Sequence, residues 1–201
     1  MSESAIKKAI EVFREHDGVM ATREAVESGV HYRTLYEMRD QGILDRLARG
    51  RYRLAELPPL TNPDLATVAL RIPRGVICLI SALAFHGLTT EVPHDVYIAL
   101  LRGSEEPRLG YPPIRVFKFS GRAFTEGIES HKIDSIRIRV YCPAKTIADC
   151  FKFRNKIGID VVIEALKFYR GTRRFDVNEL MEFARICRVD QVMRPYVEAV
   201  L

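Results

Sequence analysis

Hydrophobic and polar positions in the first quarter of the chain predict three short helices. Residues 5–16 carry apolar side chains at the one-face spacing of an amphipathic helix. The Asp-Gly pair at 17–18 ends this pattern, and Thr22 is a suitable N-cap for a second helix. A third helix is predicted over 31–41, with Gly42 in the C′ position that ends many helices.

Two extended segments, 43–48 and 51–55, follow the third helix and predict a hairpin that turns at Gly50. Side chains alternate between the faces of a strand, so Tyr52 and Leu54 share one face and Arg51 and Arg53 the other. Three helices with a very short strand and a hairpin are the plan of a winged helix-turn-helix domain.

Winged helices place their third helix in the major groove of DNA and their hairpin, the wing, against the backbone or in the minor groove. Arg33 carries the donors that read guanine, and the histidine and tyrosines beside it can contact phosphates or thymine methyl groups. A small helical domain with a solvated hairpin, used for dimerisation, is the alternative. The predicted DNA-binding residues are His31, Tyr32, Arg33, Thr34, Tyr36, Arg46, Arg49, Arg51 and Arg53.

The distribution of charge favours DNA over that alternative. The formal net charge is +5, yet residues 1–56 hold 10 Lys/Arg and 10 Asp/Glu, so this region is neutral as a whole. Within it, the four arginines between 46 and 53 are accompanied by a single acidic residue, Asp45. The positive charge is therefore concentrated on the predicted wing, where a polyanion would need it.

The remainder of the chain predicts a linker and a second, larger domain. Residues 57–73 hold a proline-rich linker and a connecting helix over 63–71. The domains expected are thus a winged helix at 1–56, this connection, and an α+β domain at 74–201 with a mostly antiparallel sheet and C-terminal helices. Its strands are predicted over 96–101, 114–119, 128–133 and 136–141, and its helices over 82–86 with Ser81 as N-cap, then 143–154, 160–169, 176–187 and 190–200.

No catalytic, cofactor-binding or metal-binding residues are predicted in either domain. Phosphate-binding loops, nucleophile elbows and zinc-binding motifs are missing from the sequence. Lys145 and Asp149 stand four apart on a predicted helix and should form an ion pair, with a catalytic or phosphate-binding role as the alternative. The four cysteines lie mostly in apolar runs, which indicates buried thiols in a reducing compartment and a cytoplasmic protein without a membrane partner.

Several segments in this order resemble the AbiEi family of antitoxins from type IV toxin–antitoxin systems, which are associated with abortive phage infection. They are GVMATREAVESGVHYRTLYEMRDQGILDRLARGRYRLA, LISALAFHGLT, VYIAL and PAKTIADCFKFRNKIGIDVVIEAL. The resemblance implies a winged helix that binds inverted repeats in its own promoter and represses the operon. It also implies a C-terminal domain that counteracts a cognate nucleotidyltransferase toxin, and a palindromic operator would bring two copies together as a homodimer on DNA.

Two other readings of the sequence stay open. The chain could be a winged-helix transcriptional regulator whose second domain senses a ligand or dimerises. It could also be an enzyme, either a nucleic-acid-processing one targeted by its wing or a kinase-like modifier of a toxin.

Overall fold

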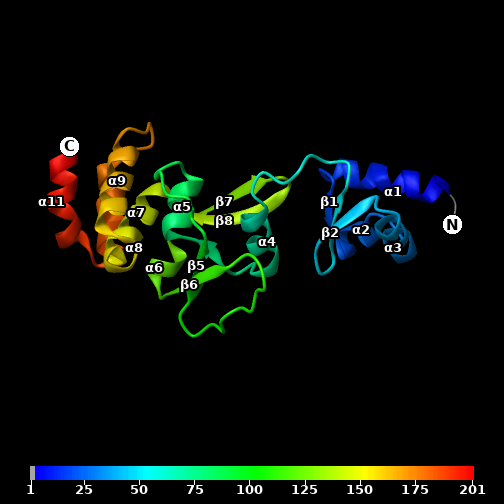
Figure 1. Ribbon diagram of the computed structural model, residues 1–201, viewed down its shortest axis with the longest axis horizontal. Coiled ribbons are helices and arrows are strands. Elements are labelled where there is room, and N and C mark those ends of the chain that lie inside the picture. Colours follow the sequence, from blue (N-terminus) through cyan, green and yellow to red (C-terminus); the bar gives the residue numbers. More distant parts are fainter. Residues whose placement is uncertain (1–2) are drawn as a thin grey trace. The chain divides into compact units, whose positions relative to one another are not determined.

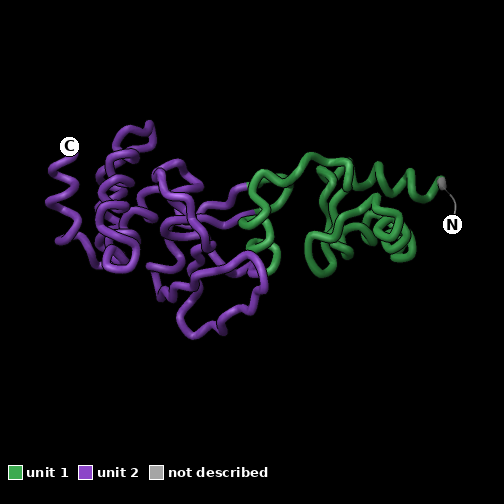
Figure 2. Tube along the Cα trace, viewed as in Figure 1, with its two compact units in different colours: residues 1–71, 132–137 green, residues 72–131, 138–201 purple. Residues whose placement is uncertain are grey.

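The computed structural model describes residues 3–201 (Figure 1). The chain divides into two compact units, drawn in different colours in Figure 2. The first holds the residues up to 71 together with 132–137, and the second holds 72–131 and 138–201. No helix in the described part of the chain is both long enough and apolar enough to span a bilayer.

The first unit has the element order of a winged helix. Its three strands form an antiparallel sheet in the order β1-β3-β2, so the wing strand β3 is central. The fourth helix, over the predicted connection, is grouped with this unit. The elements are α1 (Glu3–Glu15), β1 (Val19–Ala21), α2 (Thr22–Glu27), α3 (Tyr32–Asp40), β2 (Leu44–Ala48), β3 (Arg51–Leu54) and α4 (Pro63–Arg71).

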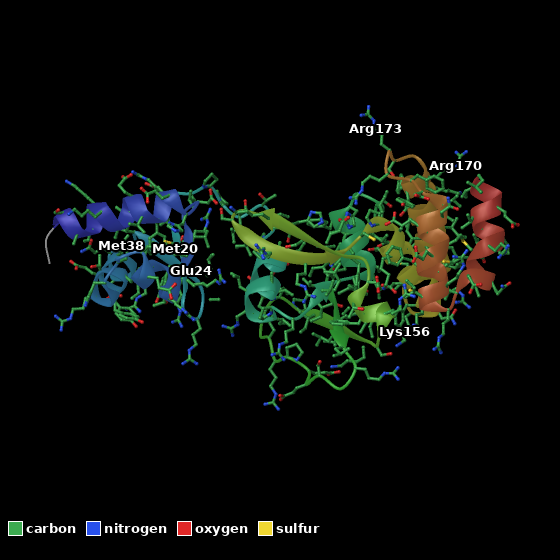
Figure 3. The ribbon with its side chains drawn as sticks, turned by 180° about the vertical axis from the view of Figure 1, so that it is seen from behind. Met20, Glu24, Met38, Lys156, Arg170 and Arg173 are labelled. Atoms are coloured by element: carbon green, nitrogen blue, oxygen red, sulfur yellow. The ribbon has the colours of Figure 1, made fainter. Side chains whose placement is uncertain are left out.

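One hydrophobic core joins α1, α2 and α3 to the sheet of the first unit. Phe13 from α1 and Met38 from α3 are fully buried, and Tyr52 and Leu54 from the wing pack into the same cluster. Met20 and Met38 are labelled in Figure 3, where both lie among the elements of this unit. Burial of one such large apolar side chain contributes about 1.5–3 kcal/mol. The predicted inward face of the wing is therefore confirmed for Tyr52 and Leu54.

Helix α3 ends as the sequence indicates. Gly42 adopts a positive φ of 71°, its N–H donates to the Arg39 carbonyl, and the Ile43 N–H donates to the Met38 carbonyl. This pair of hydrogen bonds is a Schellman motif, and it turns the chain directly into β2.

The N-cap predicted for α2 is wrong by one position. Ala21 is the N-cap, and its N–H is accepted by the Glu24 carboxylate at 2.6 Å. Thr22 is instead the first helical residue, and both its N–H and its hydroxyl donate to the carbonyl of Gly50 in the wing turn.

The second unit is built around a five-stranded sheet in the order β6-β5-β4-β8-β7. Strand β4 is antiparallel to β5 and parallel to β8, and β5 is parallel to β6. The two-residue connection between β7 and β8 requires that this pair is antiparallel. The strands are β4 (Val76–Ile77), β5 (Val96–Leu101), β6 (Ile114–Phe119), β7 (Ile128–Ile133) and β8 (Ile136–Tyr141), and the tip of the last hairpin, 132–137, is grouped with the first unit.

Helices complete the second unit. The C-terminal ones follow the sheet in sequence, and α11 continues through Pro195, where the sequence predicted a kink or a start. They are α5 (Leu79–Phe85), α6 (Arg122–Thr125), α7 (Pro143–Lys152), α8 (Arg154–Ile157), α9 (Ile159–Arg170), α10 (Val177–Cys187) and α11 (Asp190–Val200). The predicted α+β class, with a winged helix followed by a larger mixed unit, is confirmed, and antiparallel pairings predominate over the two sheets together. Within the five-stranded sheet, which was predicted to be mostly antiparallel, parallel and antiparallel pairings are equal in number.

Helix α5 begins earlier than predicted. Its N-cap is Cys78, and Ser81 is a buried residue within the helix rather than its cap. The Ser81 hydroxyl donates to the Asp95 carbonyl and accepts from the Tyr97 N–H at 2.9 Å, so it links α5 to the start of β5. The sequence does not distinguish the two roles, because serine is favoured both as a helix N-cap and where a hydroxyl bonds to backbone groups at the start of a strand.

Candidate nucleic-acid interface

Helix α3 presents aromatic and cationic side chains to solvent. Its N-cap, His31, accepts the Arg33 N–H through Nδ1 at 3.1 Å. Tyr32 and Tyr36 are 49% and 47% exposed, which is unusual for large side chains in an otherwise packed unit, and Arg33 is exposed between them. A helix surface of this kind can donate to base edges and contact thymine methyl groups.

Thr34 lies on the opposite side of α3. It is only 4% exposed, within one turn of the buried Leu35 and Met38. The prediction that Thr34 contacts DNA is therefore wrong, because helical periodicity turns this residue toward the core.

Tyr36 is held by a neighbour that sequence reasoning did not include. The guanidinium carbon of Arg39 lies 5.1 Å from the centre of the Tyr36 ring, and Arg39 also pairs with Asp40 at 2.6 Å. The three-residue spacing of tyrosine and arginine on one helix face was the available signal. Arg39 thus limits the directions in which the exposed ring can point.

The wing turn is fixed from outside the hairpin. Gly50 has a φ of 69°, and its carbonyl accepts the Thr22 N–H at 2.8 Å and the Thr22 hydroxyl at 3.2 Å. The pairing of β2 with β3 also shifts between Arg46 and Ala48, which marks a bulge at the base of the turn. These features set the backbone from which the tip side chains project.

Three of the four predicted wing arginines are accessible. Arg46 and Arg49 are exposed and Arg51 is partly exposed, and among the described residues none of the three forms an ion pair. The Arg46 guanidinium reaches only the nearby Ala48 carbonyl, at 3.4 Å. Cations that are accessible and unpaired on a hairpin tip are suited to phosphate contacts.

Arg53 is placed differently from the prediction. It is 7% exposed, stands opposite Asp45 in the strand register, and donates through Nη2 to the carbonyl of Pro58. Its Nε is buried without a hydrogen-bond partner. The expectation that Arg53 points at a phosphate is wrong, because the side chain is buried and its guanidinium donates to the backbone of the segment after the wing.

The buried ion pair of the second unit is confirmed as a structural element. Lys145 Nζ lies 2.5 Å from Asp149 Oδ2, and both side chains are fully buried on α7. The ammonium also lies 4.1 Å from the centre of the Tyr141 ring, and the Cys187 thiol donates to the other Asp149 oxygen at 3.2 Å. Burial raises the pKa of Asp149, an effect that the Lys145 ammonium partly offsets. With no exposed surface, neither group can touch a substrate.

A second polar cluster surrounds His86. His86 Nε2 lies 2.8 Å from the Tyr141 carbonyl, and burial lowers the pKa of this imidazole. His131 faces it with ring centres 6.0 Å apart and contacts Glu129, which in turn pairs with Arg174. These ion pairs lower the pKa of Glu129 despite partial burial, which alone would raise it. Among the described residues, no group of acidic, histidine or cysteine side chains has the arrangement of a metal site.

Comparisons with known proteins give a family for the winged-helix region. Residues 7–55 match the sequence model of a family described as transcriptional regulator, AbiEi antitoxin, which confirms the resemblance over this region. Among solved structures, the crystal structure of the RV2827C protein from Mycobacterium tuberculosis is similar, with 12% sequence identity and a TM-score of 0.59 over 98% of this chain and 82% of that chain. This likeness concerns the fold. No curated protein matches the chain.

Proposed function

We propose that the protein is a DNA-binding transcriptional repressor that also serves as an antitoxin and has no enzymatic activity of its own. The winged helix would bind inverted repeats in the promoter of its own operon, as a pair of copies in symmetric register. The second unit would counteract a nucleotidyltransferase toxin encoded in the same operon. The match of residues 7–55 to a family of antitoxin regulators supports both roles.

The observation that carries the DNA-binding proposal is the exposed face of α3. Arg33, Tyr32 and Tyr36 are displayed on a helix whose other face is anchored in the core. In this reading Arg33 reads base edges and the tyrosines contact phosphates or methyl groups. Arg46, Arg49 and Arg51 on the wing contact the backbone, and they add affinity without adding sequence preference.

Binding to the DNA upstream of the gene tests the first role. Fluorescence anisotropy with that duplex and with a scrambled duplex should show a preference for the first. Arg33→Ala should cost about 1–3 kcal/mol of this preference. Arg14→Ala is the matched control, because it removes the same charge from α1, where Arg14 pairs with Glu11 and Glu56. Equal losses in the two variants would contradict the assignment of α3.

Co-expression with the neighbouring gene product tests the second role. A full-length variant carrying Arg33→Ala, Arg49→Ala and Arg51→Ala should lose repression of a promoter reporter and still rescue growth from the toxin. Loss of rescue in a variant that remains folded would contradict the division of labour. An upstream region that is not bound, with no toxin gene beside it, would favour a regulator whose second domain senses a ligand or dimerises.

A further inference from the structure

A pocket of about 890 Å³ in the second unit is lined mainly by cationic side chains. Four segments distant in sequence form it: the end of β5, the turn into α6, the end of α7 and the last turns of α10. Its charged lining residues are Arg102, Arg122, Lys152, Arg185, Arg188 and one carboxylate, Glu182.

The positive charge of this pocket is largely uncompensated. Arg122 lies 3.4 Å from Glu126 and 3.9 Å from Glu182, so its charge is shared with two exposed carboxylates. Within residues 3–201, the other four cations form no ion pair. Several like charges around one concavity repel one another, and a bound anion would relieve that repulsion.

The backbone conformation of Arg188 is a second observation that points to this pocket. It follows α10 in the left-handed conformation, with φ 60° and ψ 45°. Helices that end this way usually place glycine at the left-handed residue, since a Cβ is unfavourable there. Among the described residues, five other than glycine adopt a positive φ, and Arg188 is the one of these that lines this pocket. Backbone strain of this kind is often found at ligand clamps.

We propose that this pocket binds a compact anion that carries several phosphate groups, such as inorganic triphosphate or the triphosphate of a nucleotide. Its volume is within the range of small-ligand sites. Guanidinium groups bind phosphate oxygens in pairs of hydrogen bonds, and four of the five cations are arginines. The described lining residues include no aromatic side chain on which a base could stack, which favours recognition of phosphates over recognition of a single-stranded nucleic acid.

This site is independent of the proposed DNA interface, because every lining residue belongs to the second unit. Isothermal titration of the full-length protein with sodium tripolyphosphate, at about 0.15 M salt, is the direct test. Parallel titrations with ATP, GTP and a short single-stranded RNA identify the source of the phosphates. Binding by tripolyphosphate and by a nucleoside triphosphate, with weaker binding of the RNA, is the expected result.

Two variants separate this pocket from general charge attraction. Arg185→Ala and Arg188→Gly should each weaken tripolyphosphate binding about tenfold, since each removes a charge-assisted contact. Arg188→Gly should also keep or raise the melting temperature, because glycine relaxes the left-handed position, and it therefore carries the test even if Arg185→Ala is unstable. Arg173→Ala is the matched control: Arg173 is exposed in the turn after α9, outside the pocket, and projects away from the ribbon in Figure 3.

Three results would overturn the proposal. One is the absence of tripolyphosphate and nucleotide binding at this salt concentration. Another is equal weakening by Arg173→Ala and Arg188→Gly, which would indicate attraction to the overall charge. The third is binding of the RNA alone, which would make the pocket part of a nucleic-acid surface.

Discussion

The wing arginines should divide into two groups when they are replaced. Arg49 and Arg51 are accessible at the turn, whereas Arg53 is 7% exposed and donates to the Pro58 carbonyl. Removal of the first pair should weaken DNA binding and leave the fold unchanged. Removal of Arg53 should weaken the fold and leave the phosphate contacts unchanged.

The size of each effect follows from these positions. Each phosphate contact contributes about 0.9 to the slope of log K against log salt, so Arg49→Ala/Arg51→Ala should reduce the slope by about 1.8. Between 50 and 200 mM salt the wild type should therefore lose about twelvefold more affinity than this variant. Arg53→Ala removes a largely buried side chain and leaves the Pro58 carbonyl without its donor, which should cost about 1–3 kcal/mol of unfolding free energy.

Anisotropy titrations over a salt series measure the slope, and urea denaturation measures the unfolding free energy. The duplex need not contain the operator, because phosphate contacts also govern binding to unrelated DNA. A slope that is unchanged in Arg49→Ala/Arg51→Ala would refute the wing assignment. A slope reduced by Arg53→Ala, with its stability intact, would refute the structural role given to that residue.

Two further predictions concern the second unit. Asp149→Ala leaves the Lys145 ammonium buried without its partner, so urea denaturation should show a loss of about 3–5 kcal/mol of unfolding free energy. The double variant Lys145→Met/Asp149→Leu should lose far less unfolding free energy, because no charge is left buried. Additive losses would contradict a coupled pair. His86 binds a proton less tightly when folded, so stability is complete above its ordinary pKa of about 6.5 and falls as pH drops toward the lower folded value. The unfolding free energy should change with pH by at most about 1.4 kcal/mol per pH unit for one histidine. This pH dependence should be weaker in His86→Gln between pH 7.5 and about 5.5. An identical pH dependence in that variant would assign the effect to other groups.

The sequence was sufficient for most elements because local patterns determine them. Strands β5 to β8 and helix α4 match the predicted ranges, since alternation and a proline at the first helical position are local signals. Helix caps were less reliable: Thr22 and Ser81 carry hydroxyls that bond to distant backbone groups instead of capping a helix. A local pattern does not reveal such a partner.

The candidate interface shows the same limit. Alternation correctly separated Tyr52 from its arginine neighbours, but it placed Arg53 in solvent because nothing within the strand indicates that the Pro58 carbonyl accepts a hydrogen bond from this guanidinium. The cationic pocket was not predicted at all, since Arg102 and Arg188 come from segments far apart in the chain. The number of charged residues can be counted from the sequence, but only the tertiary fold determines whether they surround one pocket.

The anchoring of the wing turn by Thr22 has a consequence for how this protein can diversify. The two hydrogen bonds end on the carbonyl of Gly50, a backbone atom, so the neighbouring residues 49 and 51 can be exchanged without loss of the support. Relatives could then gain or lose positive charge at the tip, one substitution at a time, while the turn keeps its shape. Substitution of Thr22 or Gly50 would not be tolerated in this way. Homologues should therefore vary more at positions 49 and 51 than at positions 22 and 50.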